Sequence, residues 1–442
     1  MPSLLQCLFL FALVSLVLAA PAPGRQIQKR SFKVERVPNP NFRRHVNHVR
    51  APGAGTRALV KAYRKYGVAL PPGLVDAMGR IPAANVVSNV VDANGRSFQS
   101  KATAGNASAA ANATGTGIVT ATPEQGDVEY LSPIQVGGQT MNMDFDSGSS
   151  DLWIFNTQLS KASQAGHQNY DPTKSSTFKM LTGNSFSISY GDGSGAAGNV
   201  GTDTVNIGGA TVTEQAIELA TAVSASFVED TNSNGLVGLA FSKLNTIKPT
   251  QQKTFFDNAL PTLNMPVFTA DLRKAAVGSY EFGNIDTSKF NGTMQWTAVN
   301  TTQGFWQFSS SKFSVGTGAA MKNPGDQAIA DTGTTLMLVN AAVVNGYYSQ
   351  VQGAVNNATV GGVTFPCDSE LPDLNVDVGG NFDAVVRGSD INFAPVDATG
   401  TTCFGGVQAI AGDLQIYGDI MFKSQFVAFN AGNNSLGFAP HQ

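Results

Sequence analysis

Histidine and cysteine are scarce in this 442-residue sequence, and their scarcity excludes several kinds of catalytic or metal site. Of the four histidines only His167 and His441 lie beyond residue 50, and the chain has neither a His-Glu-x-x-His nor a Gly-x-Ser-x-Gly segment. A zinc peptidase helix and the nucleophile turn of a serine hydrolase are therefore not indicated. Cys367 and Cys403 are too far apart in the sequence for a zinc knuckle. We expect no bound metal and no cofactor.

Long uncharged apolar runs are missing after residue 20, which argues against a membrane span and a membrane partner. Before that point, residues 4–18 are apolar and are followed by the small residues Ala19 and Ala20. This pattern predicts a signal peptide over residues 1–20, although no lysine or arginine precedes the apolar segment. We therefore expect a secreted, extracellular protein.

Charge is distributed unevenly along the chain. Residues 21–110 contain 15 lysines and arginines but three acidic residues. Residues 111–442 contain 13 lysines and arginines and 28 acidic residues. The basic segment is compatible with a solvated tail, a nucleic-acid arm or an internal partner of the acidic body, and nucleic-acid binding by that body is disfavoured. We expect residues 21–116 to be a propeptide, with a helix over 56–66 and a low-complexity end that cannot fold by itself.

From residue 117 onward the sequence is typical of a mostly-β protein. Short stretches of Val, Ile, Thr, Phe and Tyr, such as residues 202–207, alternate with Gly, Asn, Asp and Ser. Helical periodicity is best at residues 254–263 and 341–351. A body of this length is too large for one simple sandwich, so we expect two lobes, at residues 117–300 and 301–442.

A weak internal repeat indicates that the two lobes have a similar design. The triplets Asp146-Ser147-Gly148 and Asp331-Thr332-Gly333 each follow an apolar run, and each precedes a later apolar-apolar-Gly segment. One such triplet is an ordinary turn sequence. Two copies with matching flanks predict that each lobe offers one carboxylate to a shared site.

Two carboxylates held close together provide a hydrolytic site that needs no metal. They cannot both ionise readily, so the pair shares a proton. The ionised partner takes a proton from a water that attacks the peptide carbonyl, and the protonated partner donates to the developing oxyanion. The hydroxyls of Ser147, Ser149, Thr332 and Thr334 are suited to hydrogen-bonding the two turns and their carboxylates.

These segments resemble the pepsin family of aspartic proteases, in particular its secreted fungal aspergillopepsin and penicillopepsin group. The likeness extends from about Val119 to the C-terminus. It rests on DSGSSDLW (146–153), ISYGDGS (188–194), NGLVGLAF (234–241), AIADTGTT (328–335), TCFGG (402–406) and GDIMFKSQ (418–425). The resemblance implies an all-β, two-lobed fold with a central cleft and a β-hairpin flap. It also implies an aspartic endopeptidase.

The resemblance implies roles for individual residues. Asp146 and Asp331 correspond to the catalytic pair. Tyr190, followed by Gly191, is similar to the tyrosine of the flap, and Tyr-Gly-Asp-Gly between two strand-like runs is typical of a hairpin. Trp153 matches the tryptophan that hydrogen-bonds this tyrosine. An ordinary core position is the alternative for Trp153.

Substrate preference is implied by a second set of residues. Asp192 stands where an aspartate lets the family accept lysine before the scissile bond, although an ordinary turn aspartate is equally compatible with the sequence. Phe227 and Leu236 fall where the family lines the adjoining apolar pocket, and Gly333 and Thr334 are further substrate-binding positions. We expect a monomer that binds protein and peptide substrates and pepstatin-like inhibitors, and that prefers bulky apolar residues.

The resemblance also implies a role for the basic segment. Lys65, followed by Tyr66 and Gly67, best matches the propeptide lysine that pairs with the catalytic carboxylates and blocks the cleft. The propeptide would then be an intramolecular inhibitor. The alternative is a basic segment that only assists folding.

Covalent features complete the expectations. An even number of cysteines in a secreted body predicts a Cys367–Cys403 disulfide, with two free thiols as the alternative. Four Asn-x-Ser/Thr sites of the two lobes are candidate glycan acceptors: Asn291, Asn300, Asn357 and Asn433.

Two positions depart from the family pattern. Ser147 replaces the commoner threonine but keeps the hydroxyl, and Tyr417 replaces the usual leucine, so its hydroxyl needs a partner if it is buried. The rival to an enzyme is a catalytically inactive pepsin-fold binding or inhibitor protein. Such proteins generally lose a catalytic aspartate or the flap tyrosine, and this sequence keeps Asp146, Asp331 and Tyr190.

Overall fold

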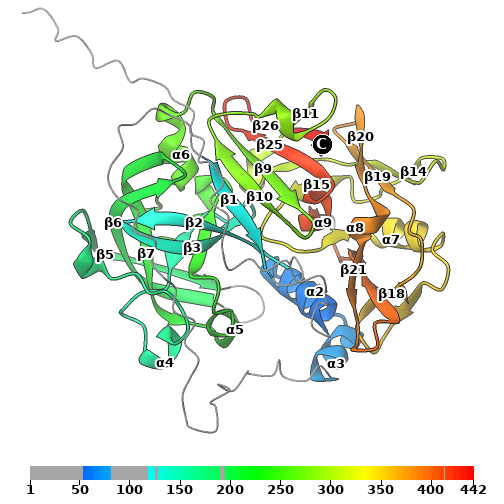
Figure 1. Ribbon diagram of the computed structural model, residues 1–442, viewed down its shortest axis with the longest axis horizontal. Coiled ribbons are helices and arrows are strands. Elements are labelled where there is room, and N and C mark those ends of the chain that lie inside the picture. Colours follow the sequence, from blue (N-terminus) through cyan, green and yellow to red (C-terminus); the bar gives the residue numbers. More distant parts are fainter. Residues whose placement is uncertain (1–52, 81–117, 125–127, 190–194, 413) are drawn as a thin grey trace, which may run out of the picture.

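β-Strands are the main regular secondary structure, as the mixture of β-branched, aromatic and turn residues predicts. The computed structural model describes residues 53–80, 118–124, 128–189, 195–412 and 414–442. The expected signal peptide and most of the expected propeptide lie outside these ranges. Within them, the all-β architecture with short helices is confirmed (Figure 1).

The largest sheet has 13 strands and joins both ends of the body, in the order β11-β26-β25-β9-β10-β1-β2-β3-β8-β4-β7-β6-β5. Because β25 and β26 lie between β11 and β9, the C-terminal strands are built into a sheet of earlier strands. The bounds are β1 (Ile118–Pro123), β2 (Tyr130–Val136), β3 (Gln139–Asp146), β4 (Leu152–Ile154), β5 (Lys179–Ser189), β6 (Gly195–Ile207), β7 (Ala210–Val223), β8 (Gly235–Gly238), β9 (Val267–Arg273), β10 (Ala276–Phe282), β11 (Gln295–Ala298), β25 (Gln425–Asn430) and β26 (Ser435–Pro440).

Three smaller sheets form the rest of the second half, in the orders β12-β15-β24-β16-β23, β14-β13-β19-β20 and β17-β18-β22-β21. Their strands are β12 (Gln307–Ser309), β13 (Lys312–Val315), β14 (Met321–Lys322), β15 (Gln327–Ala330), β16 (Met337–Val339), β17 (Val355–Asn357), β18 (Gly362–Pro366), β19 (Leu374–Val378), β20 (Phe382–Val386), β21 (Asn392–Pro395), β22 (Thr402–Gly405), β23 (Val407–Ala409) and β24 (Leu414–Tyr417).

The helices are short. They are α2 (Ala54–Lys65), α3 (Pro72–Arg80), α4 (Lys161–Gln164), α5 (Ala225–Glu229), α6 (Phe255–Ala259), α7 (Ala341–Tyr348), α8 (Gly388–Ile391) and α9 (Asp419–Phe422), with 3₁₀ turns η1 (Pro172–Lys174), η2 (Ser242–Leu244), η3 (Leu260–Thr262), η4 (Thr287–Lys289) and η5 (Thr301–Gln303). None of the described helices has the length and apolarity of a membrane span. The helix expected at 254–263 becomes α6 followed by η3, because Pro261 has no N–H for an α-helical hydrogen bond.

The internal repeat has the same local structure in both copies. β3 pairs in parallel with β8, and β15 pairs in parallel with β24. Each aspartate triplet thus begins at the end of a strand that is hydrogen-bonded to the strand of the apolar-apolar-Gly segment. Added Cβ atoms at Gly238 and Gly418 would lie 2.5 and 2.1 Å from backbone atoms of Asp151 and Thr334. Both glycines are required because the triplet loop packs directly on them.

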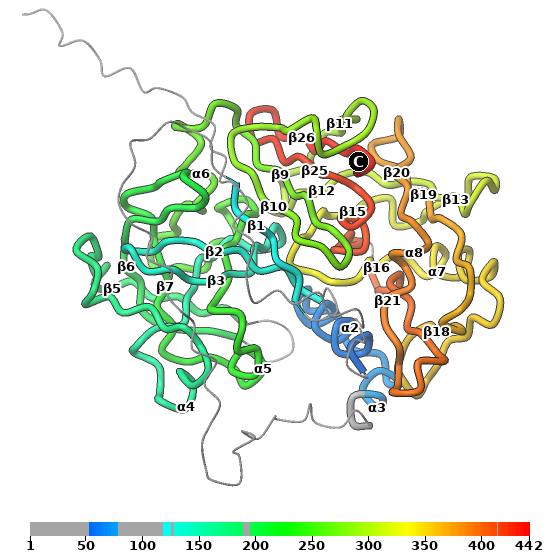
Figure 2. The backbone as a smooth tube through the Cα atoms, in the orientation of Figure 1, coloured from blue at the N-terminus to red at the C-terminus, as the bar shows by residue number. Residues whose placement is uncertain are grey.

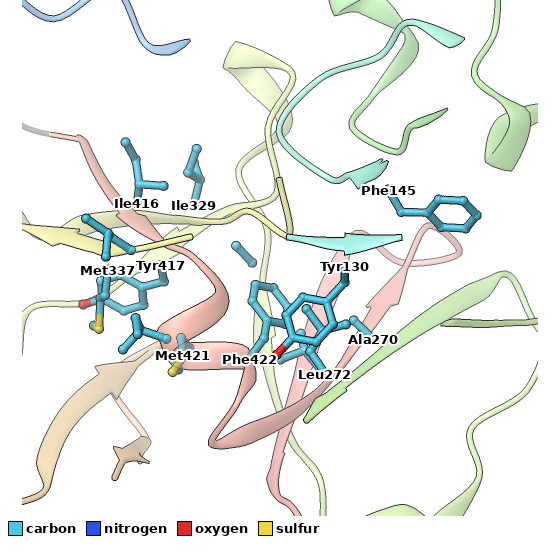
Figure 3. Close-up of a cluster of buried hydrophobic side chains, with 14 of the residues drawn as sticks. Tyr130, Phe145, Ala270, Leu272, Ile329, Met337, Ile416, Tyr417, Met421 and Phe422 are labelled. Carbon is cyan, nitrogen blue, oxygen red and sulfur yellow. The ribbon is translucent and has the colours of Figure 1, made fainter. Parts of the chain in front are cut away.

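A buried cluster beneath these loops combines both halves of the chain. Figure 3 shows Tyr130 and Phe145 from the first half in one cluster with Tyr417 and other apolar residues of the second half. The hydroxyl of Tyr417, which needs a partner when buried, hydrogen-bonds the hydroxyl of Ser310 at 2.7 Å. Tyrosine therefore replaces leucine here without leaving an unsatisfied polar atom.

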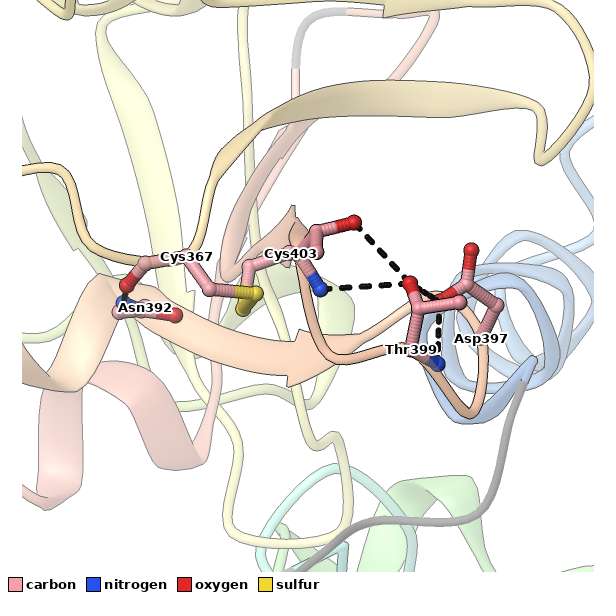
Figure 4. Close-up of a disulfide and its surroundings, with 6 residues drawn as sticks. Cys367, Asn392, Asp397, Thr399 and Cys403 are labelled. Carbon is pink, nitrogen blue, oxygen red and sulfur yellow. Dashed lines mark hydrogen bonds between the residues drawn. A yellow bond between two sulfur atoms is a disulfide. The ribbon is translucent and has the colours of Figure 1, made fainter.

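The expected disulfide is present. It joins Cys367, which follows β18, to Cys403 in β22, with the Cα atoms 4.8 Å apart (Figure 4). The adjacent strands are also paired, and Phe365 faces Cys403 in the register. The bridge therefore reinforces a pairing that backbone hydrogen bonds already make.

The candidate glycan acceptors lie on the outside of the structure. Asn291, Asn300 and Asn433 are exposed, and Asn357 is half-buried. Several also hydrogen-bond neighbouring backbone; Asn300, for example, accepts from the N–H of Thr302. Their modification stays a prediction.

A buried pair of carboxyl groups lies inside the first half of the chain. Asp151 and Glu218 are 3% and 1% exposed. Asn245 Nδ2 donates to Asp151 at 2.9 Å and to Glu218 at 3.2 Å. Burial raises the pKa of both groups, and the neighbouring charge of Asp151 raises the pKa of Glu218 further. Burial therefore favours the protonated form of these carboxyl groups, that of Glu218 in particular.

We predict that Glu218→Gln makes the thermal stability of the protein depend less on pH between 5 and 7. A carboxyl whose pKa is raised by folding contributes stability at acid pH, and this stability is lost as pH rises from the ordinary value of 4.5 through the folded-state pKa. The amide cannot ionise, so the fall in Tm between pH 5 and 7 should shrink by roughly 1–2 °C, since about 1 kcal/mol shifts Tm by about 2–4 °C in a domain of 150–250 residues and by less in a larger protein.

The matched control is Glu214→Gln on the same strand, where the glutamate is exposed and pairs with Lys179. This variant should keep the wild-type slope of Tm against pH. Equal slopes for wild type and Glu218→Gln, measured by thermal unfolding of the full chain, would contradict the role of the buried pair.

Candidate active site

The two aspartate loops meet at the centre of the molecule and are joined by reciprocal hydrogen bonds. Ser147 N donates to Thr332 Oγ1 at 3.1 Å, and Thr332 N donates to Ser147 Oγ at 2.9 Å. The same hydroxyls then donate across the interface, Ser147 Oγ to the Ala330 carbonyl at 2.8 Å and Thr332 Oγ1 to the Phe145 carbonyl at 2.6 Å. Four buried hydrogen bonds thus fix one loop against the other. All four of these hydrogen bonds are made with serine at position 147.

Each loop also directs donors at its own carboxylate. Gly148 N donates to Asp146 Oδ1 at 2.8 Å, and Ser149 Oγ donates to its Oδ2 at 2.6 Å. In the second loop Gly333 N donates to Oδ1 of the aspartate at 3.0 Å, and Thr334 Oγ1 donates to its Oδ2. Backbone and hydroxyl donors favour the ionised form of a carboxyl group. The arrangement is the same in both halves.

The two carboxylates lie over each other's loops. A Cβ added at Gly148 would lie 2.6 Å from Oδ1 of Asp331, and one added at Gly333 would lie 2.4 Å from Oδ1 of Asp146. Glycine is therefore required after each Ser/Thr, because a side chain would displace the opposite carboxylate. Asp146 and Asp331 are 1% and 0% exposed. The sequence repeat thus places both carboxylates in one buried site.

Helix α2 of the expected propeptide lies across this site. Figure 2 shows it running between the cyan and green strands of the first half and the orange strands of the second. Ala, Leu, Arg and Lys favour the helix, and its apolar residues, including Leu59 and Tyr63, are buried against the body. Thr56 Oγ1 donates to the Val360 carbonyl at 2.6 Å, and Tyr63 OH donates to the Ala409 carbonyl at 2.8 Å. The helix is anchored on the second half of the chain.

Lys65 at the end of α2 bridges the two carboxylates. Its Nζ is 2.7 Å from Asp146 Oδ1 and 2.9 Å from Asp331 Oδ2, and its side chain is 8% exposed. The next residue, Tyr66, donates its hydroxyl to Asp331 Oδ2 at 2.6 Å. The inhibitory role expected of Lys65 stays a prediction. No contact with the carboxylates was expected for Tyr66, although its position directly after Lys65 could have indicated one.

Burial and the lysine together determine the protonation of the pair. Burial raises the pKa of Asp146 despite the Lys65 charge. Burial also acts to raise the pKa of Asp331, but the Lys65 ammonium and hydrogen bonds from Asp146, Thr334 and Tyr66 lower it to about 2. Opposite shifts are expected of adjacent carboxyl groups that share a proton, and the pair titrates as a unit. Burial lowers the pKa of Lys65, yet the two carboxylates raise it above its ordinary value.

The residues expected to bind substrate lie beside the carboxylates. Phe227 and Leu236 line a pocket of about 490 Å³ that also contains Asp146, Lys65 and Gly333. Its occupation by a substrate side chain stays a prediction.

The flap residues expected from the sequence, Tyr190, Gly191 and Asp192, lie outside the described residues. The strands on either side, β5 and β6, are antiparallel, and their pairing extends to Ser189 and Gly195. Trp153 is buried and packs edge-on against Phe227, with ring centroids 4.8 Å apart. Its Nε1 has no hydrogen-bond partner in the part of the chain that the structure describes. The expected bond from Trp153 to the flap tyrosine therefore stays a prediction.

Comparisons with known proteins agree with this site. A family model described as eukaryotic aspartyl protease matches residues 129–441. The chain is 46% identical to a putative aspergillopepsin A-like aspartic endopeptidase of Aspergillus fumigatus, over 99% of each chain. It is 51% identical to penicillopepsin-1 of Penicillium rubens, over 73% of this chain and 81% of the relative. It is 44% identical to endothiapepsin of Cryphonectria parasitica, over 93% of this chain and 90% of the relative.

We predict that Ser147→Ala destabilises the contact between the two loops. The substitution removes the acceptor of Thr332 N and the donor to the Ala330 carbonyl, and it leaves both groups buried. An unsatisfied buried polar group costs about 1–3 kcal/mol, so thermal unfolding should occur at a clearly lower temperature. Ser147→Thr keeps the hydroxyl and should stay near the wild-type Tm. Unchanged Tm values for both variants would show that the reciprocal bonds do not stabilise the fold.

Proposed function

Because the chain belongs to the eukaryotic aspartyl protease family, we propose that it is a secreted acid endopeptidase made as a zymogen. In this proposal, a water molecule held between Asp146 and Asp331 attacks the substrate peptide bond. The observation that carries the proposal is the bridging of two buried carboxylates by one ammonium group, at 2.7 and 2.9 Å. A group of that size in contact with both carboxylates marks the place that a water would take.

The reaction follows from the sharing of one proton by the pair. The ionised carboxylate removes a proton from the water, and the water oxygen bonds to the carbonyl carbon of the substrate. The protonated carboxyl donates to the carbonyl oxygen, which gives a tetrahedral diol. The C–N bond then breaks as a proton passes to the leaving nitrogen. The loop N–H and hydroxyl donors keep both carboxyl groups oriented throughout.

The propeptide acts in this proposal as an intramolecular inhibitor. Lys65 occupies the position of the attacking water and neutralises the charge of the pair, and the Tyr66 hydroxyl takes a further lone pair of Asp331. Acid protonates the carboxyl groups and weakens this attraction, so the helix is released. The apolar segment of residues 4–18 supports secretion. The Cys367–Cys403 disulfide supports an oxidising compartment.

The alternative of an inactive binding or inhibitor protein of the same fold is less well supported. Both carboxylates are present, and each keeps its loop N–H and its hydroxyl donor. A binding protein has no need for two buried carboxyl groups that a cationic helix must cover.

We predict that Asp146→Asn abolishes proteolysis. The asparagine cannot accept the proton of the water, so cleavage of denatured globin between pH 2.5 and 7 should fall by about 10³-fold or more. A pepstatin-like inhibitor should have the same effect on the wild-type protein. Asp383→Asn, at an exposed aspartate that pairs with Lys312, is the control and should retain activity.

Both protein preparations are first incubated in acid, and mass analysis locates the propeptide cleavage. A folded, processed wild-type protein without activity at any pH would favour the inactive binding protein. Activity that survives Asp146→Asn would disprove the mechanism.

We predict that Lys65→Gln raises the pH at which the propeptide is released. A carboxyl whose pKa is lowered on docking stabilises the docked state above its undocked pKa and loses this effect as pH falls through the docked value. For Asp331 the docked pKa value is about 2, so release of the wild-type helix is expected at strongly acid pH, as this value is approached. Without the ammonium, release should move up by about one pH unit or more.

The measurement is the appearance of processed chain and of activity after incubation at each pH. Lys65→Arg keeps the charge and should behave more like the wild type than Lys65→Gln does. The same release midpoint for all three proteins would contradict the inhibitory role of Lys65.

A further inference from the structure

His167 is a buried histidine that neither the carboxylate pair nor the propeptide helix contacts. It is 9% exposed, and both of its ring nitrogens face backbone carbonyl oxygens. Nδ1 is 2.9 Å from the carbonyl oxygen of Ser233, and Nε2 is 3.1 Å from that of Val228. A neutral imidazole carries one N–H and can donate to only one of these oxygens, whereas the imidazolium carries two. Only the charged ring therefore satisfies both carbonyls.

The ring is held in this position by the segment that carries it. His167 N donates to the Gln164 carbonyl at 3.2 Å, and the His167 carbonyl accepts from Asn169 Nδ2 at 2.8 Å. The imidazole stacks on Phe155, with ring centroids 3.8 Å apart and an interplanar angle of 11°. Phe155 is 1% exposed and belongs to a buried apolar cluster of the first half. The imidazole is thus fixed against the core of this half.

The two carbonyls belong to the connection between β7 and β8, residues 224–234, which includes α5. Val228 lies in the last turn of α5, where helix carbonyls have no partner inside the helix. Among the described residues, His167 provides the one side chain from outside this connection that hydrogen-bonds its backbone. The two bonds are made on either side of residues 229–232. The ring therefore clamps the connection to the core.

The same connection forms a wall of the apolar pocket. Phe227, the residue before Val228, lines the cavity of about 490 Å³ that also contains Asp146 and Leu236. Its ring packs edge-on against Trp153, whose own ring lies 5.9 Å from that of Phe155. A shift of the Val228 carbonyl would therefore move the aromatic wall beside the carboxylates.

We propose that His167 is a positioning residue for substrate binding. In acid its imidazolium donates to both carbonyls and holds the connection, and with it Phe227, in the shape that accepts an apolar side chain. This contribution is present at acid pH and is lost as pH rises and the ring gives up a proton, because one of the two hydrogen bonds is then lost. The inference rests on the proposed function, since the pocket is that of the same cleft.

Other charged groups lie on the elements around this connection. They are Lys161 in α4, Glu229 in α5, Asp230 after α5 and Glu124 after β1. In the part of the chain that the structure describes, the polar contacts of the His167 ring are the two carbonyl oxygens and no carboxylate. Burial raises the pKa of Asp230 to about 6 and that of Glu124 to about 8, so both groups also titrate as pH rises. Their contribution has to be removed in the test.

The first test observes the ring N–H protons of His167 by NMR, in the full chain labelled with ¹⁵N-histidine. The sequence contains four histidines, and the signals of His167 are those that His167→Gln removes. At pH 5 both of its ring protons should be visible, because each is buried in a hydrogen bond and protected from exchange with water. A single visible ring proton, or none, would overturn the proposal. This measurement needs no proteolytic activity.

The second test measures the affinity for peptides whose scissile bond is reduced and uncleavable, using protein obtained by acid incubation of the full chain. The peptides carry Phe or Ala immediately before that bond. At pH 4, His167→Gln should bind the Phe peptide about five- to tenfold more weakly than the wild type, as expected for the loss of one hydrogen bond. The Ala peptide should be affected much less, because its side chain does not reach Phe227. At pH 6.5 the wild type should approach the variant.

Matched variants assign the effect to the ring. His167→Phe can keep the stacking but has no N–H donor, and it should bind the Phe peptide at least as weakly as His167→Gln. His441→Gln changes the other histidine of the body, whose ring bonds the Phe422 carbonyl at 2.8 Å, and it should keep the wild-type affinity and its pH dependence. In a background with Glu124→Gln and Asp230→Asn, the difference between His167 and Gln at this position should remain.

The outcomes separate this inference from the proposed function. Equal affinity of the wild type and His167→Gln at pH 4 would overturn the role of His167, and so would an equal loss for the Phe and Ala peptides. Where the wild type cleaves, His167→Gln should raise KM and leave kcat nearly unchanged, because Asp146 and Asp331 are untouched. Cleavage with the same KM in both proteins would overturn the role of His167 and leave the proposed function intact. A pH-dependent affinity that His167→Gln removes would support it even if no substrate is cleaved.

Discussion

The structure depends on holding two buried carboxyl groups beside each other. Two such charges repel and lose hydration, so their proximity has to be enforced by the surrounding structure. The reciprocal bonds between Ser147 and Thr332 enforce it, since each hydroxyl is both acceptor and donor across the interface. The loop glycines leave the space that the opposite carboxylate occupies. Every other feature of the site follows from this constraint.

The large sheet extends this constraint beyond the loops. Because β25 and β26 pair with strands of the first half, the C-terminal end of the chain is held in the same sheet as β3, the strand that ends at Asp146. Rings from both halves pack below them, with Phe268 and Phe429 stacked at 4.3 Å. The precise geometry of the carboxylates is therefore a property of the whole body rather than of two short loops.

The basic helix α2 also offsets the unfavourable burial of these charges. The two adjacent buried carboxylates pair with Lys65, and Glu129 pairs with Lys61 on the same helix. Such pairing relieves the unfavourable burial of charge, and it also makes the docking dependent on pH. In the proposed zymogen, inhibition and release therefore arise from one set of charges.

Much of the fold and of the central site could be predicted from the sequence, because the signals are local. The β-rich texture, the helix near residues 56–66, the disulfide pair and the doubled aspartate triplet are each contained in short segments or in simple counts. The position of Lys65 followed from its motif. Its contacts with both carboxylates agree with that prediction.

Other features became visible only when distant segments were brought together. Nothing in the local sequence marks Glu129 as the partner of Lys61, and the Ser310 partner of Tyr417 lies 107 residues away. Likewise, the addition of β25 and β26 to the first sheet has no local signature. The sequence by itself determined which side chains carry a charge, a titratable proton or a hydroxyl group. Only the tertiary structure decided which of them share a buried space, because burial and distance depend on contacts between residues far apart in the chain.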